Sequence, residues 1–441
     1  MDKLVIEGRG ALQGSVPIGG AKNAALPILI STLTCDGTHH FHNVPQLADI
    51  ESTLSLLGRI GCPSRVSTSE NGYGQSVEID TTRIAFSEAP YELVRKMRAS
   101  VLVLGPLLAR CGHARVALPG GCAIGVRPID QHLKGLEALG CRFELKGGYI
   151  EGRVDRLTGA EINLSVPTVT GTENILMAAV LADGVSVINN AAREPEVVDL
   201  ARFLRSMGAR IKGEGTSRIE IDGVPALRSP TTPFSIMGDR IEAGTYLLAG
   251  LITRGDITVT GAPVSDMRAL LEHIQSVGAR VSVGDDWIRV EADGELKPVS
   301  IETAPHPGFP TDMQAQWMTA MSVIEGSCLV SERIFENRFM HVAELARLGA
   351  NIQIKGSSAH VMGVSSLTGA TVMATDLRAS ASLVMAGLVA QGQTEVLRIY
   401  HLDRGYEKLV KKMQGLGAAI TRVSTNTQVP VGSLQAKVRE S

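Results

Sequence analysis

Charged residues stand at the start of several otherwise apolar, helix-like runs, where charge is least expected. Lys22-Asn23, Arg98 and Arg378 each begin such a run, and Asp312 and Arg404 stand at comparable places. A helix N-terminus carries free N–H groups and partial positive charge, and arginine adds a bidentate grip on phosphate or carboxylate. Each charge alone would be explained as a helix cap or a surface pair. The set predicts a site for anions, because basic residues recur at matched positions in a chain of net charge −2.

A second chemical feature is Cys122, which follows Pro119-Gly120-Gly121 and precedes Gly125 and Arg127. Such a loop exposes the thiol, and nearby positive charge lowers a thiol pKa and makes it reactive. The alternative for any cysteine is a small buried residue. That alternative is favoured for three others in apolar surroundings, Cys35, Cys111 and Cys328.

The elements that would position these residues recur along the chain. An apolar residue, a Gly and a small residue end a helical pattern and precede a strand-like run about every 70 residues. The glycines of this phrase are Gly61, Gly140, Gly208, Gly278, Gly349 and Gly417. A Gly at this place predicts a left-handed helix C-terminus. Each unit therefore reads helix, turn, strand, loop, helix, turn, strand, with a further strand before the next unit.

The chain of 441 residues is too long for one ordinary core, and two domains of three units each suit its length. We predict the domain boundary near residue 236, after the Pro- and Ser-rich stretch 228–235. Equivalent positions in repeats lie at the same end of a domain, so we expect the charged residues to converge on a cleft between the two domains.

Composition excludes several classes of protein. Apolar residues make up 44% and charged residues 20% of the chain, which is ordinary for a globular protein. The near-neutral net charge favours neither nucleic acid nor a membrane surface as partner. No signal peptide or membrane-spanning run is recognised, and six scattered cysteines without a C-x-x-C pair predict a reduced, cytoplasmic protein without a disulfide framework or structural zinc.

Eight ordered segments carry a resemblance to a known family. They are residues 19–25 (GGAKNAA), 97–100 (MRAS), 118–128 (from LPGGC to RP), 190–196 (NAAREPE), 309–316 (FPTDMQAQ), 335–339 (FENRF), 374–380 (ATDLRAS) and 403–407 (DRGYE). The chain thereby resembles the enolpyruvyl transferase superfamily, and within it the UDP-N-acetylglucosamine 1-carboxyvinyltransferases.

The resemblance implies an α/β fold, the two-domain inside-out α/β barrel, with three βαβαββ units in each domain. It also implies that residues 22–236 form the first domain, with the cysteine loop at 119–128, and that residues 1–21 and 237–441 form the second. The site would lie in the cleft between them.

The implied activity transfers the enolpyruvyl group of phosphoenolpyruvate to the 3-hydroxyl of UDP-N-acetylglucosamine by addition and elimination, releasing phosphate. This is the committed step of peptidoglycan synthesis. The reaction needs an acid, a base and cations around a phosphate and a carboxylate. It needs no metal or cofactor, and its partners are the two small-molecule substrates.

The resemblance also assigns residue roles. Cys122 is implied as proton donor to C3 and as the thiol that forms a covalent adduct, and Asp312 as the base, although Asp312 would also suit a helix N-cap. Lys22 and Arg404 complete the catalytic set. Phosphoenolpyruvate would be bound by Lys22, Asn23, Cys122, Arg127, Arg378 and Arg404. The UDP-sugar would be bound by Asn23, Arg98, Arg127, Pro128, Ile129, Asp130, Gln131, Thr168, Val169, Thr170, Gly171, Asp312 and Ile334. Arg338 and Asp376 would support the site.

Three alternatives remain open. The shikimate-pathway enolpyruvyl transferase shares the chemistry but lacks the cysteine of the Pro-Gly-Gly-Cys loop. A non-catalytic UDP-sugar sensor would be expected to lose Cys122, Asp312 or an arginine, and this chain keeps them. A purely structural repeat protein needs no matched arginines.

Overall fold

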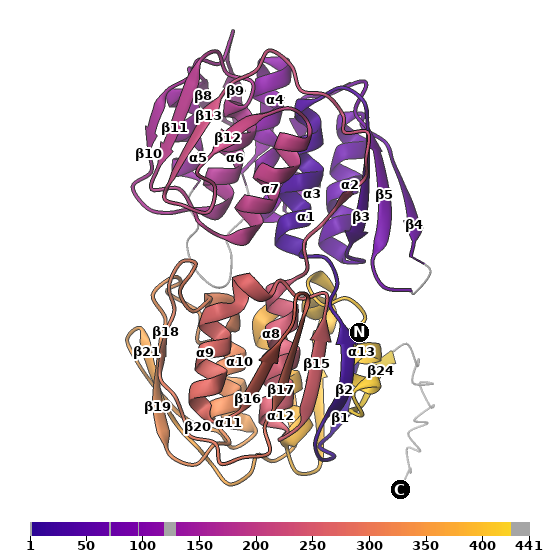
Figure 1. Cartoon of the computed structure of the whole chain (residues 1–441), viewed down its shortest axis with the longest axis vertical. Helices are drawn as coiled ribbons and strands as arrows, with labels where there is room; N and C mark the ends of the chain where they lie inside the picture. The colour runs from indigo at the N-terminus through magenta and orange to yellow at the C-terminus, as the bar shows by residue number, and fades with distance from the viewer. Residues whose placement is uncertain (1, 70–71, 96, 119–128, 425–441) are drawn as a thin grey trace, which may run out of the picture.

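The structure, a computed structural model, describes residues 2–69, 72–95, 97–118 and 129–424. These residues form two bodies, one above the other, with the N-terminus in the lower one (Figure 1). One buried apolar cluster takes its residues from 21–237 and the other from 4–18 and 241–420. We call the two bodies the upper and the lower domain. The chain therefore passes between them twice, near residues 18–21 and near residues 237–241.

Six four-stranded sheets share one strand order. In each unit the first two strands are parallel, and the last strand lies antiparallel between the second and the third. Three units are completed by strands from distant parts of the chain, and in one of them, in the lower domain, β2 (Gln13–Pro17) pairs with β15 (Asp256–Thr260). In the upper domain β14 (Phe234–Ser235) pairs with β3 (Thr38–Val44), and in the lower domain β1 (Asp2–Glu7) pairs with β23 (Gln393–Leu397).

The upper domain holds three units. The first contains β14, α1 (Lys22–Ser31), η1 (Thr32–Thr34), β3, α2 (Ala48–Ile60), β4 (Ser64–Thr68) and β5 (Gln75–Asp80). The second contains β6 (Glu88–Ala89), α3 (Tyr91–Val94), η2 (Arg98–Val103), α4 (Leu104–Cys111), β7 (His113–Ala117), α5 (Asp130–Ala138), β8 (Arg142–Lys146) and β9 (Tyr149–Arg153). The third contains β10 (Glu161–Asn163), α6 (Val169–Ala179), β11 (Val185–Asn189), α7 (Pro195–Ser206), β12 (Arg210–Lys212) and β13 (Arg218–Asp222).

The lower domain repeats this plan. Its first unit contains β2 (Gln13–Pro17), α8 (Arg240–Ile252), β15 (Asp256–Thr260), η3 (Val264–Met267), α9 (Arg268–Val277), β16 (Arg280–Val283) and β17 (Trp287–Glu291). Its second contains β18 (Ile301–Glu302), η4 (Thr311–Met313), α10 (Gln314–Met321), β19 (Ser327–Ser331), α11 (His341–Arg347), β20 (Asn351–Lys355) and β21 (Ser358–Met362). Its third contains β22 (Thr371–Met373), α12 (Leu377–Val389), β23, η5 (Ile399–Arg404), α13 (Leu409–Gly415), β24 (Ala419–Ser424) and β1.

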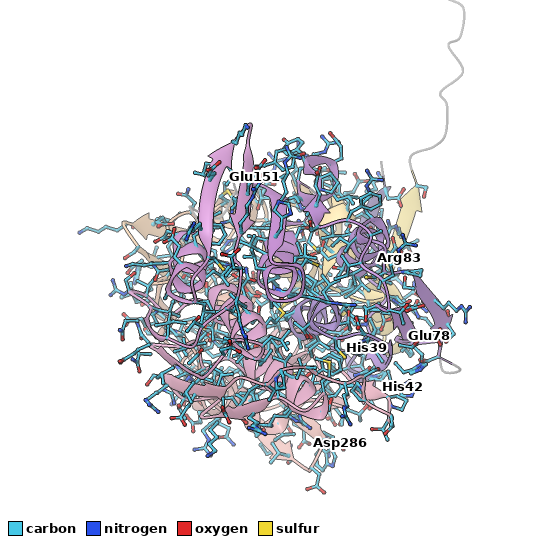
Figure 2. All side chains as sticks on the ribbon, turned by 90° about the horizontal axis from the view of Figure 1, so that it is seen from above. His39, His42, Glu78, Arg83, Glu151 and Asp286 are labelled. Atoms are coloured by element: carbon cyan, nitrogen blue, oxygen red, sulfur yellow. The ribbon has the colours of Figure 1, made fainter. Side chains whose placement is uncertain are left out.

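The first long helix of each unit lies inside and the sheets lie outside. Helices α1, α6, α8, α10 and α12 are buried along nearly their whole length. Strand β3 illustrates that the sheets lie outside. His39 on β3 is buried, whereas His42 on β3 and Glu78 on the neighbouring β5 lie at the edge of the molecule seen from above (Figure 2). Helices inside and sheets outside make the predicted inside-out α/β barrel, and the predicted fold class is confirmed.

The predicted helix ends are also confirmed. All six glycines of the repeated phrase have a positive φ, between 93° and 113°. A residue with a side chain is strained at such angles, so Gly ends the helix at low cost and the following strand can begin at once.

Candidate functional site

Two basic residues from different domains share one buried carboxylate. Asp49, in the first turn of α2, accepts from the Nζ of Lys22 at 3.2 Å and from the Nε of Arg404 at 2.8 Å. Lys22 begins α1 in the upper domain, whereas Arg404 ends η5 in the lower domain. Burial alone would raise the pKa of Asp49, but Lys22 and Arg404 hold it below its ordinary value. Asp49 therefore joins the two domains at the place where the predicted cations meet.

A second carboxylate lies between two arginines of the lower domain. Asp312 accepts from Arg338 at 2.6 Å and from the Nη2 and Nε of Arg378 at 2.9 and 3.1 Å. Both arginine side chains are nearly buried, whereas 27% of the Asp312 side chain stays exposed. Burial works against its charge, but Arg378 and Arg338 hold the pKa of Asp312 well below its ordinary range.

Local structure explains why Arg378 is placed so firmly. Asp376 caps α12 by accepting from the backbone N–H groups of Arg378 and Ala379 at 2.9 and 3.0 Å. The same kind of cap was one interpretation of Asp312, and that interpretation is wrong. Asp312 lies inside η4, and the residue before α10 is Met313, which makes no side-chain cap. The carboxylate of Asp312 is taken up by the two arginines instead.

The two carboxylate clusters lie close enough to interact electrostatically. Burial lowers the pKa of Lys22, Asp49 raises it, and the charges of Arg378 and Arg404 lower it again. Asn23, next to Lys22 on α1, is exposed. The predicted residues Lys22, Asp312, Arg338, Arg378 and Arg404 are thus brought together from both domains, which is the geometry that a small dianionic or trianionic ligand needs.

A further group of predicted residues surrounds His132 in the upper domain. His132 lies on α5, within 3.2 Å of the hydroxyl of Thr170 and 3.0 Å of the amide of Asn174. Burial lowers the pKa of His132 to about 4, helped by the charge of Arg98 and opposed by that of Asp130. The histidine is therefore neutral at pH 7, and its ring joins α5 to α6.

The remaining residues predicted for the UDP-sugar are placed around the same helix starts. Gln131 donates to Asp130 at 2.8 Å and accepts from the backbone of Ser165 at 3.0 Å. Thr168 caps α6 by accepting from the N–H of Gly171, and Val169 is the first residue of that helix. Ile129 directly precedes α5.

Other predicted positions are less well joined to this site. In the lower domain the backbone N–H of Ile334 donates to Glu332 at 2.8 Å, so a ligand would have to use the carbonyl of Ile334. Cys122, Arg127 and Pro128 lie outside the described residues. Among the other cysteines, the expectation of burial is wrong for Cys111, which is exposed at the end of α4, whereas Cys35 and Cys328 are buried as expected.

Three site residues were missed by the sequence analysis. Asp49 stands at the start of a second helix, so comparison of that position among the repeats would have found it. His132 had no signal beyond its place after Asp130. The third is Glu196, which accepts from Arg240 at 2.9 and 3.2 Å across the domain junction. Its partner Arg240 opens an apolar helix as Lys22 does.

The described residues contain no group of three or more His, Cys, Asp or Glu side chains able to hold a metal ion. Within the same ranges, no helix is long and apolar enough to cross a membrane.

Comparison with known proteins decides the family. A sequence model described as EPSP synthase (3-phosphoshikimate 1-carboxyvinyltransferase) matches residues 6–413. A UDP-N-acetylglucosamine 1-carboxyvinyltransferase from Anaeromyxobacter dehalogenans is 54% identical over 96% of this chain and 100% of its own length. The chain belongs to the UDP-N-acetylglucosamine 1-carboxyvinyltransferase family of enolpyruvyl transferases.

Other relatives agree with this assignment. A family member from Desulfosudis oleivorans is also 54% identical, again over 96% of this chain and 100% of its own length. Among solved structures, the enolpyruvyl transferase NikO from Streptomyces tendae matches with a TM-score of 0.84 at 24% identity, covering 96% of this chain and 99% of its own. EPSP synthase from Acinetobacter baumannii matches with a TM-score of 0.72 at 18% identity, covering 96% of this chain and 100% of its own. These structures share the fold, and the resemblance stated from the eight motifs is confirmed.

Proposed function

We propose that the protein transfers the enolpyruvyl group of phosphoenolpyruvate to the 3-hydroxyl of UDP-N-acetylglucosamine, in the committed step of peptidoglycan synthesis. The observation that carries the proposal is that Lys22 of the upper domain converges with Arg404 and the Asp312 cluster of the lower domain. This cluster consists of Asp312 and the two arginines that bind it, Arg338 and Arg378. Phosphoenolpyruvate carries a phosphate and a carboxylate, and these cations match both groups. The relatives that are about half identical over nearly the whole chain bear the name of this reaction.

We assign the proton transfers as follows. Asp312 takes the proton of the sugar 3-hydroxyl as its oxygen forms the bond to C2 of phosphoenolpyruvate, while Cys122 supplies a proton to C3. In the second step C3 loses a proton, the C2–C3 double bond forms again, and the C–O bond to phosphate breaks. Lys22, Arg378 and Arg404 compensate the charge of the leaving phosphate, and Arg127 would add to this grip.

The depressed pKa of Asp312 fits a base that becomes effective only when substrate is present. While Arg338 and Arg378 both pair with Asp312, its carboxylate is a weak base. An anionic substrate that pairs with Arg378 removes part of that stabilisation and raises the pKa of Asp312. Arg378 is suited to this exchange because its Nη1 is buried without a hydrogen-bond partner among the described residues.

The other proposed contacts divide between the two substrates. The nucleotide sugar would be held by Asn23, Arg98, the helix starts at Asp130 and Val169, and the backbone of Ile334. Further contacts would come from Pro128, Ile129, Gln131, Thr168, Thr170 and Gly171. Arg338 and Asp376 act through Asp312 and Arg378. The protein would act in the cytoplasm.

The test measures phosphate release from phosphoenolpyruvate with UDP-N-acetylglucosamine and, in parallel, with shikimate 3-phosphate. We expect release only with the nucleotide sugar, and its loss by at least about 100-fold in Asp312→Asn because the base is removed. Release only with shikimate 3-phosphate would assign the chain to the other branch. Nucleotide-sugar binding without any release would make it a sensor.

A further inference from the structure

A buried tyrosine lies against Arg378, one of the two arginines that bind Asp312. Tyr406 lies between η5 and α13 and is only 3% exposed. Its hydroxyl lies 3.0 Å from the hydroxyl of Thr245 on α8 and 3.2 Å from the amide nitrogen of Gln316 on α10. The guanidinium of Arg378 on α12 lies over its ring, 5.5 Å from the ring centre. Tyr406 therefore meets all three inner helices of the lower domain, with its hydroxyl at α8 and α10 and its ring at α12.

The direction of each hydrogen bond follows from the partners. Thr245 donates its own hydrogen to the carbonyl of Ile241 at 2.8 Å, one turn back along α8. Its oxygen must therefore accept from the Tyr406 hydroxyl, and the Tyr406 oxygen accepts from Gln316. That oxygen then presents its negative end to Arg378. Burial lowers the pKa of Arg378, but Asp312 and Tyr406 raise it, so the guanidinium stays charged.

Gln316 extends the same network to the proposed base. Its amide nitrogen donates to the backbone carbonyl of Asp312 at 3.0 Å as well as to Tyr406. Gln316 is fully buried, so a lost hydrogen bond in this network cannot be replaced by bulk water. Gln316 thus holds the backbone of Asp312, and it also binds Tyr406, which lies against the guanidinium of Arg378.

We propose that Tyr406 is a positioning residue that, together with Gln316, holds Asp312 and Arg378 in register for proton transfer. The inference rests on the proposed function, because only that reaction gives the relative position of Asp312 and Arg378 a catalytic role. The position itself can be measured without activity. Tyr406 itself would touch neither substrate. A displacement of about 1 Å in a catalytic group costs up to about 100-fold in rate, so a modest loss of positioning is measurable.

The test compares Tyr406→Phe with Tyr246→Phe. Tyr246 is the fully buried neighbour of Thr245 on α8, and its hydroxyl has no hydrogen-bond partner among the described residues. We expect kcat/KM for phosphoenolpyruvate to fall about tenfold in Tyr406→Phe and to stay unchanged in Tyr246→Phe. Thr245→Val should share part of the loss and Thr245→Ser should restore it, because serine keeps the accepting oxygen.

The pH profile separates positioning from a merely structural role. If Arg378 is held less closely to Asp312, the pKa of Asp312 rises, and the acidic limb of kcat/KM against pH moves to higher pH. A smaller fraction of folded enzyme would lower the whole profile without moving that limb. An unmoved limb with unchanged kcat/KM in folded Tyr406→Phe overturns the inference.

A crystal structure of Tyr406→Phe supplies a readout that does not depend on activity. We expect the distance from Arg378 Nη2 to Asp312 Oδ2, 2.9 Å in the unaltered protein, to lengthen. An unchanged distance would also overturn the inference. Absence of phosphate release by the unaltered protein would instead refute the proposed function and leave this geometric comparison to decide the role of Tyr406.

Discussion

At the scale of single residues, we expect substitution of Asp49 to have the largest effect, because its carboxylate pairs with Lys22 of the upper domain and Arg404 of the lower domain. We predict that Asp49→Asn lowers the free energy of unfolding by about 2 kcal/mol, since Lys22 is left buried and without its counter-charge. The same change should lower kcat/KM for phosphoenolpyruvate about tenfold, because Lys22 and Arg404 lose their common anchor. Asp36→Asn is the matched control, as Asp36 also pairs with an arginine, Arg110, but its side chain is 78% exposed. Denaturant unfolding and steady-state kinetics check both variants, and equal effects of the two changes would contradict the prediction.

At the scale of elements, the close approach of α4 to α6 depends on Gly105. A Cβ at this position would lie 2.3 Å from the backbone oxygen of Asn174, and the N–H of Gly105 donates to the side chain of Asn174 at 2.7 Å. We predict that Gly105→Ala destabilises the protein by about 1–3 kcal/mol, because neither helix can yield without moving its neighbours. Gly58, exposed within α2, has nothing within 4 Å of its Cβ position, so Gly58→Ala should instead stabilise by about 0.5–1 kcal/mol. Thermal unfolding of the two variants should therefore shift in opposite directions, and a shift of the same sign would refute the packing argument.

At the scale of the whole molecule, Asp199 ties α7 to the segment where the chain leaves the upper domain. It accepts from the backbone N–H of Met237 at 3.1 Å, and its side chain is almost wholly buried. Burial raises its pKa to about 6 from an ordinary 3.8, with Glu196 and Asp266 adding to the effect and Met237 and Arg202 opposing it. The folded state therefore favours the protonated form, so this contribution to stability is present below pH 3.8 and is lost as the pH rises to about 6.

The prediction for Asp199 follows from that sign. Relative to the unaltered protein, the free energy of unfolding of Asp199→Asn should rise by about 2 kcal/mol between pH 4 and pH 7, because asparagine carries no charge to bury. Unfolding by denaturant across this range measures the difference. Asp222→Asn, at an exposed ion pair with Arg210, should show no such trend. A difference that stays constant with pH in Asp199→Asn would show that the carboxylate is charged in the fold at little cost.

Much of the architecture could be read from the sequence because the fold repeats. A glycine that must adopt a positive φ, after an apolar helical pattern, marks the same place in six units, as Gly61 and Gly417 illustrate. Local geometry dictates such a signal, so it survives in the sequence whatever the units pack against. The charges at helix starts were visible for the same reason. Their type and position were therefore available without the structure.

What only the tertiary structure decided is which of these charges meet. Arg404 reaches Asp49 across 355 positions of the chain, and Tyr406 reaches Thr245 across 161. No local pattern encodes such a meeting, because it depends on how six units close around two sets of inner helices and how two domains face each other. The sequence by itself determined the repeated structural unit, the family and which basic residues stand at the helix starts. The packing of the units determined which carboxylate each cation shares and how strongly each pKa is displaced, since both depend on burial and distance.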